Sequence, residues 1–205
     1  MSVGIVILAA GESARMGAPK QLLEFRGATL LQHAIDCARS IRNAPVAVVL
    51  GAHAEQIQMH LKGADVLVVE NPEWSAGMGG SLRVGLNALL TAHPTLSSVL
   101  FLVCDQPLIT AAALGNLIAA QERTGHVIVA SEYDGILGVP ALFGRELFPQ
   151  LLALGGGEGA RQVIAARRDF AIGVPFPDGT VDIDTPVDYA RLRSAPDDLP
   201  LLTLV

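Results

Sequence analysis

The chain has 205 residues, of which 51% are hydrophobic and 17% charged, and its formal net charge is −6 at pH 7. This length and apolar content suffice to bury the core of one domain and exclude a disordered chain. The negative charge excludes nonspecific nucleic-acid binding, which needs a basic surface, so we expect no nucleic-acid partner. Two cysteines supply no disulfide framework, and no apolar run reaches the roughly 18 residues of a membrane span. We therefore expect no membrane contact and a cytoplasmic location.

The first element is an apolar run over residues 5–8, which has the pattern of a buried parallel strand. Such strands are covered on both faces and therefore show no polar alternation. The strand leads into a loop of small residues that carries Arg15 and Lys20. Small residues at 9–11 let the backbone approach a ligand, and successive backbone amides there form an anion-binding concavity. With the two basic side chains, the loop is typical of a polyphosphate site, and an ordinary strand-to-helix turn is the alternative.

Helical and strand-like segments then alternate up to residue 130. Apolar spacing predicts helices over 29–41, 53–61, 81–90 and 111–124, strands over 45–50, 65–69, 98–103 and 127–130, and a glycine-rich loop over 71–80. This order predicts an α/β fold with a mostly parallel central sheet between two helical layers, Rossmann-like in its three-layer arrangement. Right-handed crossovers would bring the loops after the strands to one edge.

The segment after residue 130 is less regular. We expect strands over 136–139 and 170–174, helices around 144–154 and 159–168, and a last strand over 181–184. A final helix can begin at Pro186 with Thr185 as its cap. No linker demands a second domain, so one domain is expected over residues 1–193, with a tail over 194–205. The apolar end of the tail, 199–205, covers either a groove of this chain or a neighbouring subunit.

Two carboxylates end apolar segments that are far apart in the chain. Asp105 follows the run 98–103, at the carboxyl edge where ligands bind in open α/β sheets. Asp184 is preferred over Asp182 as the metal ligand, because Asp184 is the last residue of the segment 181–184. Each has a plain alternative, because an aspartate also caps a turn or a helix. Magnesium is usually held by one or two carboxylates plus substrate oxygens, so this pair with the basic loop favours a nucleoside triphosphate site with Mg²⁺ on Asp105 and Asp184.

Several blocks together resemble a known family. The string Leu-Ala-Ala-Gly-x-Ser-x-Arg-Met-Gly-x-x-Lys at 8–20 resembles the MobA-like nucleotidyltransferases, most closely their molybdenum cofactor cytidylyltransferase branch. Further blocks similar to the family's follow in order at 77–82 (Gly-Met-Gly-Gly-Ser-Leu), 104–107 (Cys-Asp-Gln-Pro), 133–140, 159–161 and 182–186 (Asp-Ile-Asp-Thr-Pro). They cover nearly the whole chain, which implies the family's nucleotidyltransferase fold. The resemblance also implies a nucleotide-binding half over about 1–130 and an acceptor-binding half over about 131–193.

The resemblance assigns roles to particular positions. Asp105 and Asp184 would hold the metal, and Arg15 and Lys20 would stabilise the charge on the leaving pyrophosphate, which makes these four the expected catalytic residues. The expected nucleotide-binding residues are Leu8, Ala9, Ala10, Gly11, Ser13, Arg15, Lys20, Asn71, Gly77, Ser81 and Asp105. The expected acceptor-binding residues are Gly138, Pro140 and Arg161. Asn71 has the alternative role of a turn former before a proline.

The implied reaction transfers CMP from CTP to the phosphate of molybdopterin and releases pyrophosphate, and a molybdoenzyme would receive the product. The methyl group of Ala10 favours CTP, because it fills space that a larger purine would need. The alternatives are GTP or another nucleotide, another phosphorylated acceptor, and a non-catalytic carrier of the molybdenum cofactor. The chain departs from the family at Gly157, where an aspartate is usual, and at Gly79 and Gly80, where serines are usual. These departures concern the binding of the second substrate.

Overall fold

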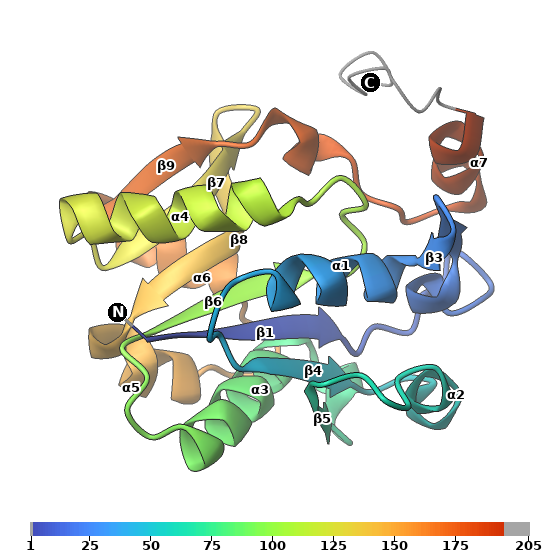
Figure 1. Ribbon diagram of the computed structural model, residues 1–205, viewed down its shortest axis with the longest axis horizontal. Coiled ribbons are helices and arrows are strands. Elements are labelled where there is room, and N and C mark those ends of the chain that lie inside the picture. The colour runs from blue at the N-terminus through green and yellow to red at the C-terminus, as the bar shows by residue number, and fades with distance from the viewer. Residues whose placement is uncertain (1, 195–205) are drawn as a thin grey trace.

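The computed structural model describes residues 2–194, and a seven-stranded sheet runs through this part of the chain (Figure 1). The strand order is β5-β4-β1-β6-β8-β7-β9, and only β8 runs antiparallel to its neighbours among these seven. The strands are β1 Val3–Ala9, β4 Val46–Leu50, β5 Leu67–Glu70, β6 Ser98–Val103, β7 Ile128–Tyr133, β8 Ile136–Gly144 and β9 Ala171–Pro175, with a small hairpin of β2 Glu24–Phe25 and β3 Ala28–Thr29 beside them. The predicted α/β class with a mostly parallel sheet is confirmed.

Helices cover both faces of the sheet. They are α1 Leu30–Arg39, α2 Ala54–Met59, α3 Met78–Ala92, α4 Ala111–Thr124, α5 Phe148–Leu152, α6 Ala160–Ala166 and α7 Pro186–Ser194. In Figure 1, α1 and α4 lie in front of the sheet, and α3, α5 and α6 lie behind it. None of the helices between residues 2 and 194 has the length and apolar character needed to cross a membrane.

The alternation of side chains along β1 explains the two apolar layers. Ile5 and Ile7 pack with α1 and α4, whereas Val6 and Leu8 pack with α3, α5 and α6. Successive side chains of a strand point to opposite faces, so a strand that is apolar throughout is buried on both sides. The carboxyl ends of β1, β4 and β6 all lie at the right of Figure 1. Their following loops therefore gather at one edge, as the sequence predicts.

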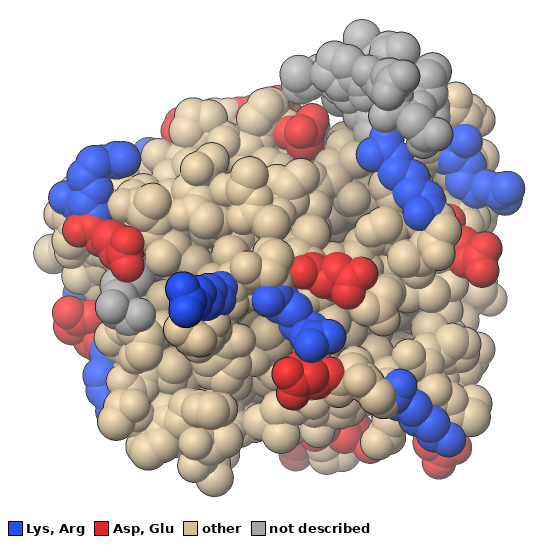
Figure 2. Space-filling view, in the orientation of Figure 1, with Lys and Arg blue, Asp and Glu red and all other residues tan. Residues whose placement is uncertain are grey.

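On the α1 and α4 face, acidic and basic side chains are interspersed among uncharged ones, and some of both signs lie near the centre (Figure 2). They do not gather into a patch of one sign on this face. A surface that binds nucleic acid nonspecifically needs such a basic patch.

Two predicted elements differ from the structure in the second half of the chain. The strand predicted over 136–139 continues to Gly144, because a register shift opposite Ala130 and Ser131 of β7 accommodates Pro140, which has no N–H to pair. Its antiparallel direction follows from the two-residue turn at 134–135, where both residues have positive φ. The helix predicted over 144–154 is divided into a 3-10 turn, Arg145–Leu147, and the short α5. Proline at 149 is tolerated only in the first turn of a helix, so α5 starts beside it.

Two further predictions are wrong nearer the site. The helix predicted over 81–90 already begins at Met78, so Gly79 and Gly80 belong to α3 and not to the preceding loop. The segment 181–184 is not a strand. The N–H of Ile183 donates to the backbone oxygen of Asp105, 3.0 Å away, and the Ile183 side chain is buried beneath α7 with Phe25. Burial of this one side chain holds the segment in place without a ladder of hydrogen bonds.

The sheet joins the two predicted halves of the domain. Strands β1, β4, β5 and β6 come from the first half, and β8 pairs directly with β6. The predicted boundary between the halves near residue 130 falls within β7. The predicted tail lies outside the described residues from 195 onward.

Candidate active site

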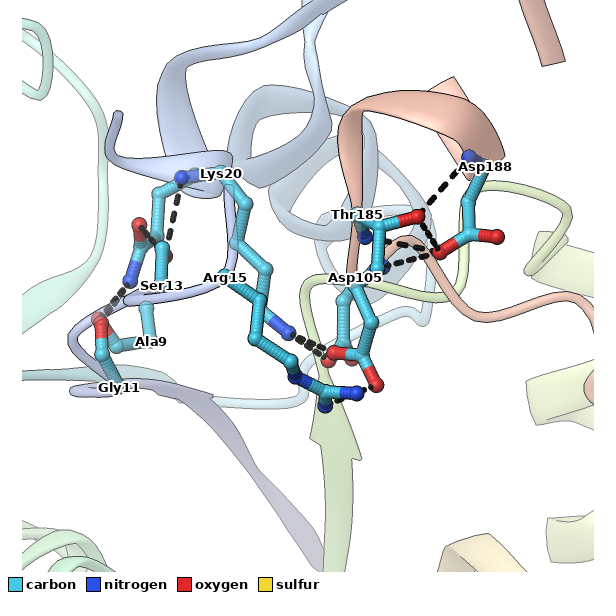
Figure 3. Close-up of polar contacts among 10 residues, drawn as sticks. Ala9, Gly11, Ser13, Arg15, Lys20, Asp105, Thr185 and Asp188 are labelled. Atoms are coloured by element: carbon cyan, nitrogen blue, oxygen red, sulfur yellow. Dashed lines mark hydrogen bonds and ion pairs between the residues drawn. The ribbon is translucent and has the colours of Figure 1, made fainter. Parts of the chain in front are cut away.

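The loop after β1 is held in shape by its own neighbours. The buried side chain of Gln21 donates from Nε2 to the backbone oxygens of Ala9 and Gly11, each at 2.9 Å. Ser13, which has a positive φ of 60°, accepts a hydrogen bond at its Oγ from the backbone N–H of Lys20 (Figure 3). The loop therefore closes on itself and presents the Lys20 side chain to the carboxyl edge of the sheet.

Four charged side chains meet at this edge, as the sequence predicts. Lys20 Nζ lies 2.5 Å from Asp105 Oδ2 and 3.0 Å from Asp184 Oδ1. Arg15 donates to Asp184 Oδ2 at 2.7 Å (Figure 3). The Lys20 and Asp105 side chains are only 15% and 20% exposed, whereas Arg15 is 70% exposed. Lys20 and Asp105 thus form the inner pair, and Arg15 covers the cluster from the solvent side.

The local electrostatics keep Lys20 and Asp184 charged near neutral pH. Burial lowers the pKa of Lys20, but the charges and hydrogen bonds of Asp105 and Asp184 outweigh it, and the pKa lies above its usual value. Partial burial raises the pKa of Asp184, but Lys20 and Arg15 together hold it below its usual value. Lys20 therefore stays positive and Asp184 stays negative at this edge of the sheet.

Two further groups beside this cluster have shifted pKa values. Desolvation and the nearby charges of Asp105 and Asp184 raise the pKa of Asp182 to about 6. Burial, followed by the charge of Asp105, raises the pKa of Cys104 to about 12. The Cys104 thiol is therefore neutral at pH 7 and packs as a small apolar group.

The side chains at the site fit the magnesium ion that the sequence predicts. Asp105 Oδ1 is buried without a hydrogen-bond partner, and Asp184 offers a partly exposed carboxylate. Within residues 2–194, no three His, Cys, Asp or Glu side chains lie close enough to hold a metal ion by themselves. Magnesium commonly takes one or two carboxylates and completes its shell with phosphate oxygens and water. The Lys20 ammonium lies within ion-pair distance of both carboxylates.

Two cavities meet at Asp105. The first, of about 340 Å³, is lined by the β1 loop, by Trp74 and by the start of α3. The second, of about 360 Å³, is lined by Tyr133, by residues 157–162 and by Asp182. Both cavities share Gly77, Met78, Val103 and Asp105. Two ligands bound side by side would therefore meet at the Asp105 carboxylate.

The first cavity contains most of the expected nucleotide-binding residues. Its lining includes Leu8, Ala9, Ala10, Gly11, Lys20, Gly77, Ser81 and Asp105. Asn71 is buried, and its side chain donates to Ser81 Oγ at 3.0 Å and accepts from the N–H of Glu73. These contacts match the turn-forming alternative for Asn71, with an indirect effect on the cavity through Ser81.

Of the three expected acceptor-binding residues, Arg161 lines the second cavity. Gly138 and Pro140 lie in β8 on either side of Val139, which is the residue that lines it. Gly138 packs against the ring of Tyr133, where a Cβ would lie 2.2 Å from the phenol oxygen. Their contribution in the structure is to shape β8 around Val139 and Tyr133.

Sequence reasoning missed two supporting side chains, Gln21 and Asp188. Gln21 looks like an ordinary polar residue in the sequence, and only its burial reveals the tie to the loop. Thr185 and Asp188 form a reciprocal cap at the start of α7, in which Asp188 accepts hydrogen bonds from the N–H and the hydroxyl of Thr185, each at 2.8 Å (Figure 3). This cap orients Asp184, which directly precedes it. The spacing Thr-x-x-Asp was the available signal for it.

Comparison with known proteins gives a consistent result. A family model described as "MobA-like NTP transferase domain" matches residues 5–170. The chain is 34% identical over 128 residues to the bifunctional protein GlmU of Thermobifida fusca, and 35% identical over 127 residues to nicotine blue oxidoreductase of Paenarthrobacter nicotinovorans. These matches cover 60% and 62% of this chain, but only 26% of GlmU and 60% of the oxidoreductase.

Solved structures give the same picture over more of the chain. Rv0371c from Mycobacterium tuberculosis has a TM-score of 0.80 and 31% identity, and the match covers 95% of this chain and 98% of that chain. Another structure of Rv0371c is described as a complex with manganese.

Proposed function

Because the chain belongs to the MobA-like NTP transferase family, we propose that it is a magnesium-dependent nucleotidyltransferase that transfers CMP from CTP to the phosphate of molybdopterin. The observation that carries this proposal is the cluster of Lys20, Asp105 and Asp184 at the meeting point of two cavities. A triphosphate in the first cavity and a phosphate-bearing acceptor in the second would bring their phosphates together there. The product would pass to a molybdoenzyme in the cytoplasm.

The chemical step depends on charge and position. An oxygen of the acceptor phosphate attacks the α-phosphorus of CTP, a new phosphate–phosphate bridge forms, and the bond to the β-phosphate oxygen breaks as pyrophosphate leaves. A phosphomonoester has a second pKa of about 6, so it is mostly dianionic at pH 7 and needs no general base. Lys20 and Arg15 supply positive charge to the leaving pyrophosphate. When bound at Asp105 and Asp184, Mg²⁺ would neutralise and polarise the phosphate oxygens.

The relatives support this proposal unevenly. The manganese complex of Rv0371c agrees with the use of a divalent cation. Nicotine blue oxidoreductase bears the name of a redox enzyme, so similarity by itself does not separate transfer from redox chemistry. The cluster of cations and carboxylates favours nucleotidyl transfer, because its cations suit a polyphosphate and its carboxylates suit a divalent metal ion.

The preference for CTP rests on Ala10. Ala10 lies in the lining of the first cavity and is 6% exposed. A side chain at this point keeps the base away from the backbone, which favours the smaller pyrimidine ring.

Pyrophosphate release from each of the four nucleoside triphosphates, with and without molybdopterin, tests the proposal. We expect release with CTP and magnesium, dependent on molybdopterin. Release with GTP alone would overturn the base assignment. Pyrophosphate release that requires a different phosphorylated acceptor would overturn the assignment of molybdopterin as the acceptor. If no nucleotide led to pyrophosphate release, the alternative function, a non-catalytic carrier of the molybdenum cofactor, would be favoured.

A further inference from the structure

A backbone contact joins the start of α3 to the loop over residues 155–159. The N–H of Gly79 donates to the backbone oxygen of Gly156 at 3.2 Å. Residues 77 and 78, just before Gly79, line both cavities, whereas residues 157–159 line only the second. The contact therefore connects the wall between the cavities to the lining of the second one.

The contact is too close for any side chain. A Cβ on Gly79 would lie 2.0 Å from the backbone oxygen of Gly155, and one on Gly77 would lie 2.1 Å from that of Gly156. From the opposite side, a Cβ on Gly156 would lie 2.4 Å from the backbone oxygen of Ala76. Backbone atoms cannot turn aside as a flexible side chain can. A methyl group at any of these positions must therefore separate the two segments.

The 155–159 loop is the partner that would yield. Helix α3 is anchored by Leu82, Leu86 and Leu89, which are fully buried against the sheet. The loop is largely exposed and is braced from within, since Glu158 accepts a hydrogen bond from the N–H of Gly155 at 2.6 Å. A side chain at position 79 would displace the loop as a unit and leave α3 in place.

We propose that Gly79 is a positioning residue that holds the 155–159 loop against α3 and thereby sets the width of the second-substrate cavity. This inference rests on the proposed function, because it names the feature that confines the acceptor beside Asp105. Arg161 is the second residue of α6 and follows the loop by two residues, so displacement of the loop also moves this cation relative to Asp105. The first cavity is formed by the β1 loop and α3 and keeps its shape.

The test compares Gly79→Ala with Gly115→Ala. Gly115 lies within α4, where a Cβ meets nothing within 4 Å, so this control adds the same methyl group away from both cavities. In the CTP and molybdopterin assay, Gly79→Ala should raise the KM for molybdopterin by about tenfold to a hundredfold, the range in which a small misplacement acts. The KM for CTP should change by less than about threefold, because the residues that bind CTP in the first cavity stay in place. Gly115→Ala should match the wild type.

A second measurement needs no substrate. Amide hydrogen exchange over residues 154–161 should become faster in Gly79→Ala, while exchange over residues 82–92 of α3 stays protected. Gly156→Ala, which breaks the contact from the loop side, should reproduce both results if Gly79→Ala does not fold. An unchanged KM for molybdopterin, an equal rise in both KM values, or unchanged exchange in the loop would overturn the inference. If the wild type were inactive but loop exchange were faster in Gly79→Ala, the proposed function and the role of Gly79 in acceptor binding would be refuted. The contact between Gly79 and the 155–159 loop would still be supported.

Discussion

Replacement of Asp105 by asparagine separates the charge of the inner carboxylate from its shape. The side chain accepts one hydrogen bond from Lys20 at 2.5 Å, and its other oxygen is buried without a partner. Asparagine has the same size and keeps the backbone contact with Ile183. Lys20 retains Asp184 as a charged partner at 3.0 Å. A neutral acceptor then replaces a charged one, which should lower the free energy of unfolding by only about 1 kcal/mol.

The effect on catalysis should be much larger. Loss of one preorganised charged group costs about 2–4 kcal/mol of transition-state stabilisation, by comparison with oxyanion-hole donors. At about 1.36 kcal/mol per factor of ten, this corresponds to a fall in kcat/KM of about 30-fold to 900-fold. Pyrophosphate release with CTP and molybdopterin measures it, and thermal unfolding shows whether the variant is folded.

A matched control is Asp65→Asn. The Asp65 side chain is 93% exposed and lies 3.7 Å from Arg39, an arrangement that contributes little. This variant should have wild-type activity. If folded Asp105→Asn retained kcat/KM within about threefold of the wild type, the assignment of Asp105 to the reacting phosphates would be wrong.

Three other variants test the loop, the outer carboxylate and the packing of α3. Gln21→Ala leaves two loop carbonyl oxygens without their donor and should lower the free energy of unfolding by about 1–3 kcal/mol, measured in urea. Partial burial raises the pKa of Asp184, but Lys20 and Arg15 together lower it by more, so the pKa lies below its usual value. Asp184 therefore stabilises the fold above the unfolded pKa and loses that effect as the pH falls through the lower folded value, so Asp184→Asn should lose less stability than the wild type as the pH falls below 3.8, the ordinary pKa of an aspartate. Gly85→Ala places a Cβ 2.4 Å from Val6 of β1, and overpacking should cost about 1–3 kcal/mol, seen as a lower thermal midpoint, whereas an unchanged midpoint would mean that α3 can shift.

Much of the fold was predictable because it depends on local patterns. Apolar runs without polar alternation predict buried parallel strands, and the helix predicted over 111–124 agrees with α4 at both ends. The errors occur where a distant contact overrides the local pattern. Gly79 and Gly80 are typical of a loop, but they are helical here because the 155–159 loop packs directly on this turn. Likewise, residues 181–184 have a strand-like pattern, but the burial of Ile183 under α7 decides their conformation.

By itself, the sequence determined that one basic loop and Asp105 belong to the same edge of the sheet. The reason is geometric, because the carboxyl ends of parallel strands joined by right-handed crossovers share one edge. Only the tertiary structure decided that Lys20 lies between Asp105 and Asp184, which are 85 and 164 residues away from it in the chain. It alone decided that Gln21 ties down the loop and that glycine backbones join the 155–159 loop to α3. Such contacts depend on how the elements pack in three dimensions, and no spacing along the chain encodes that packing.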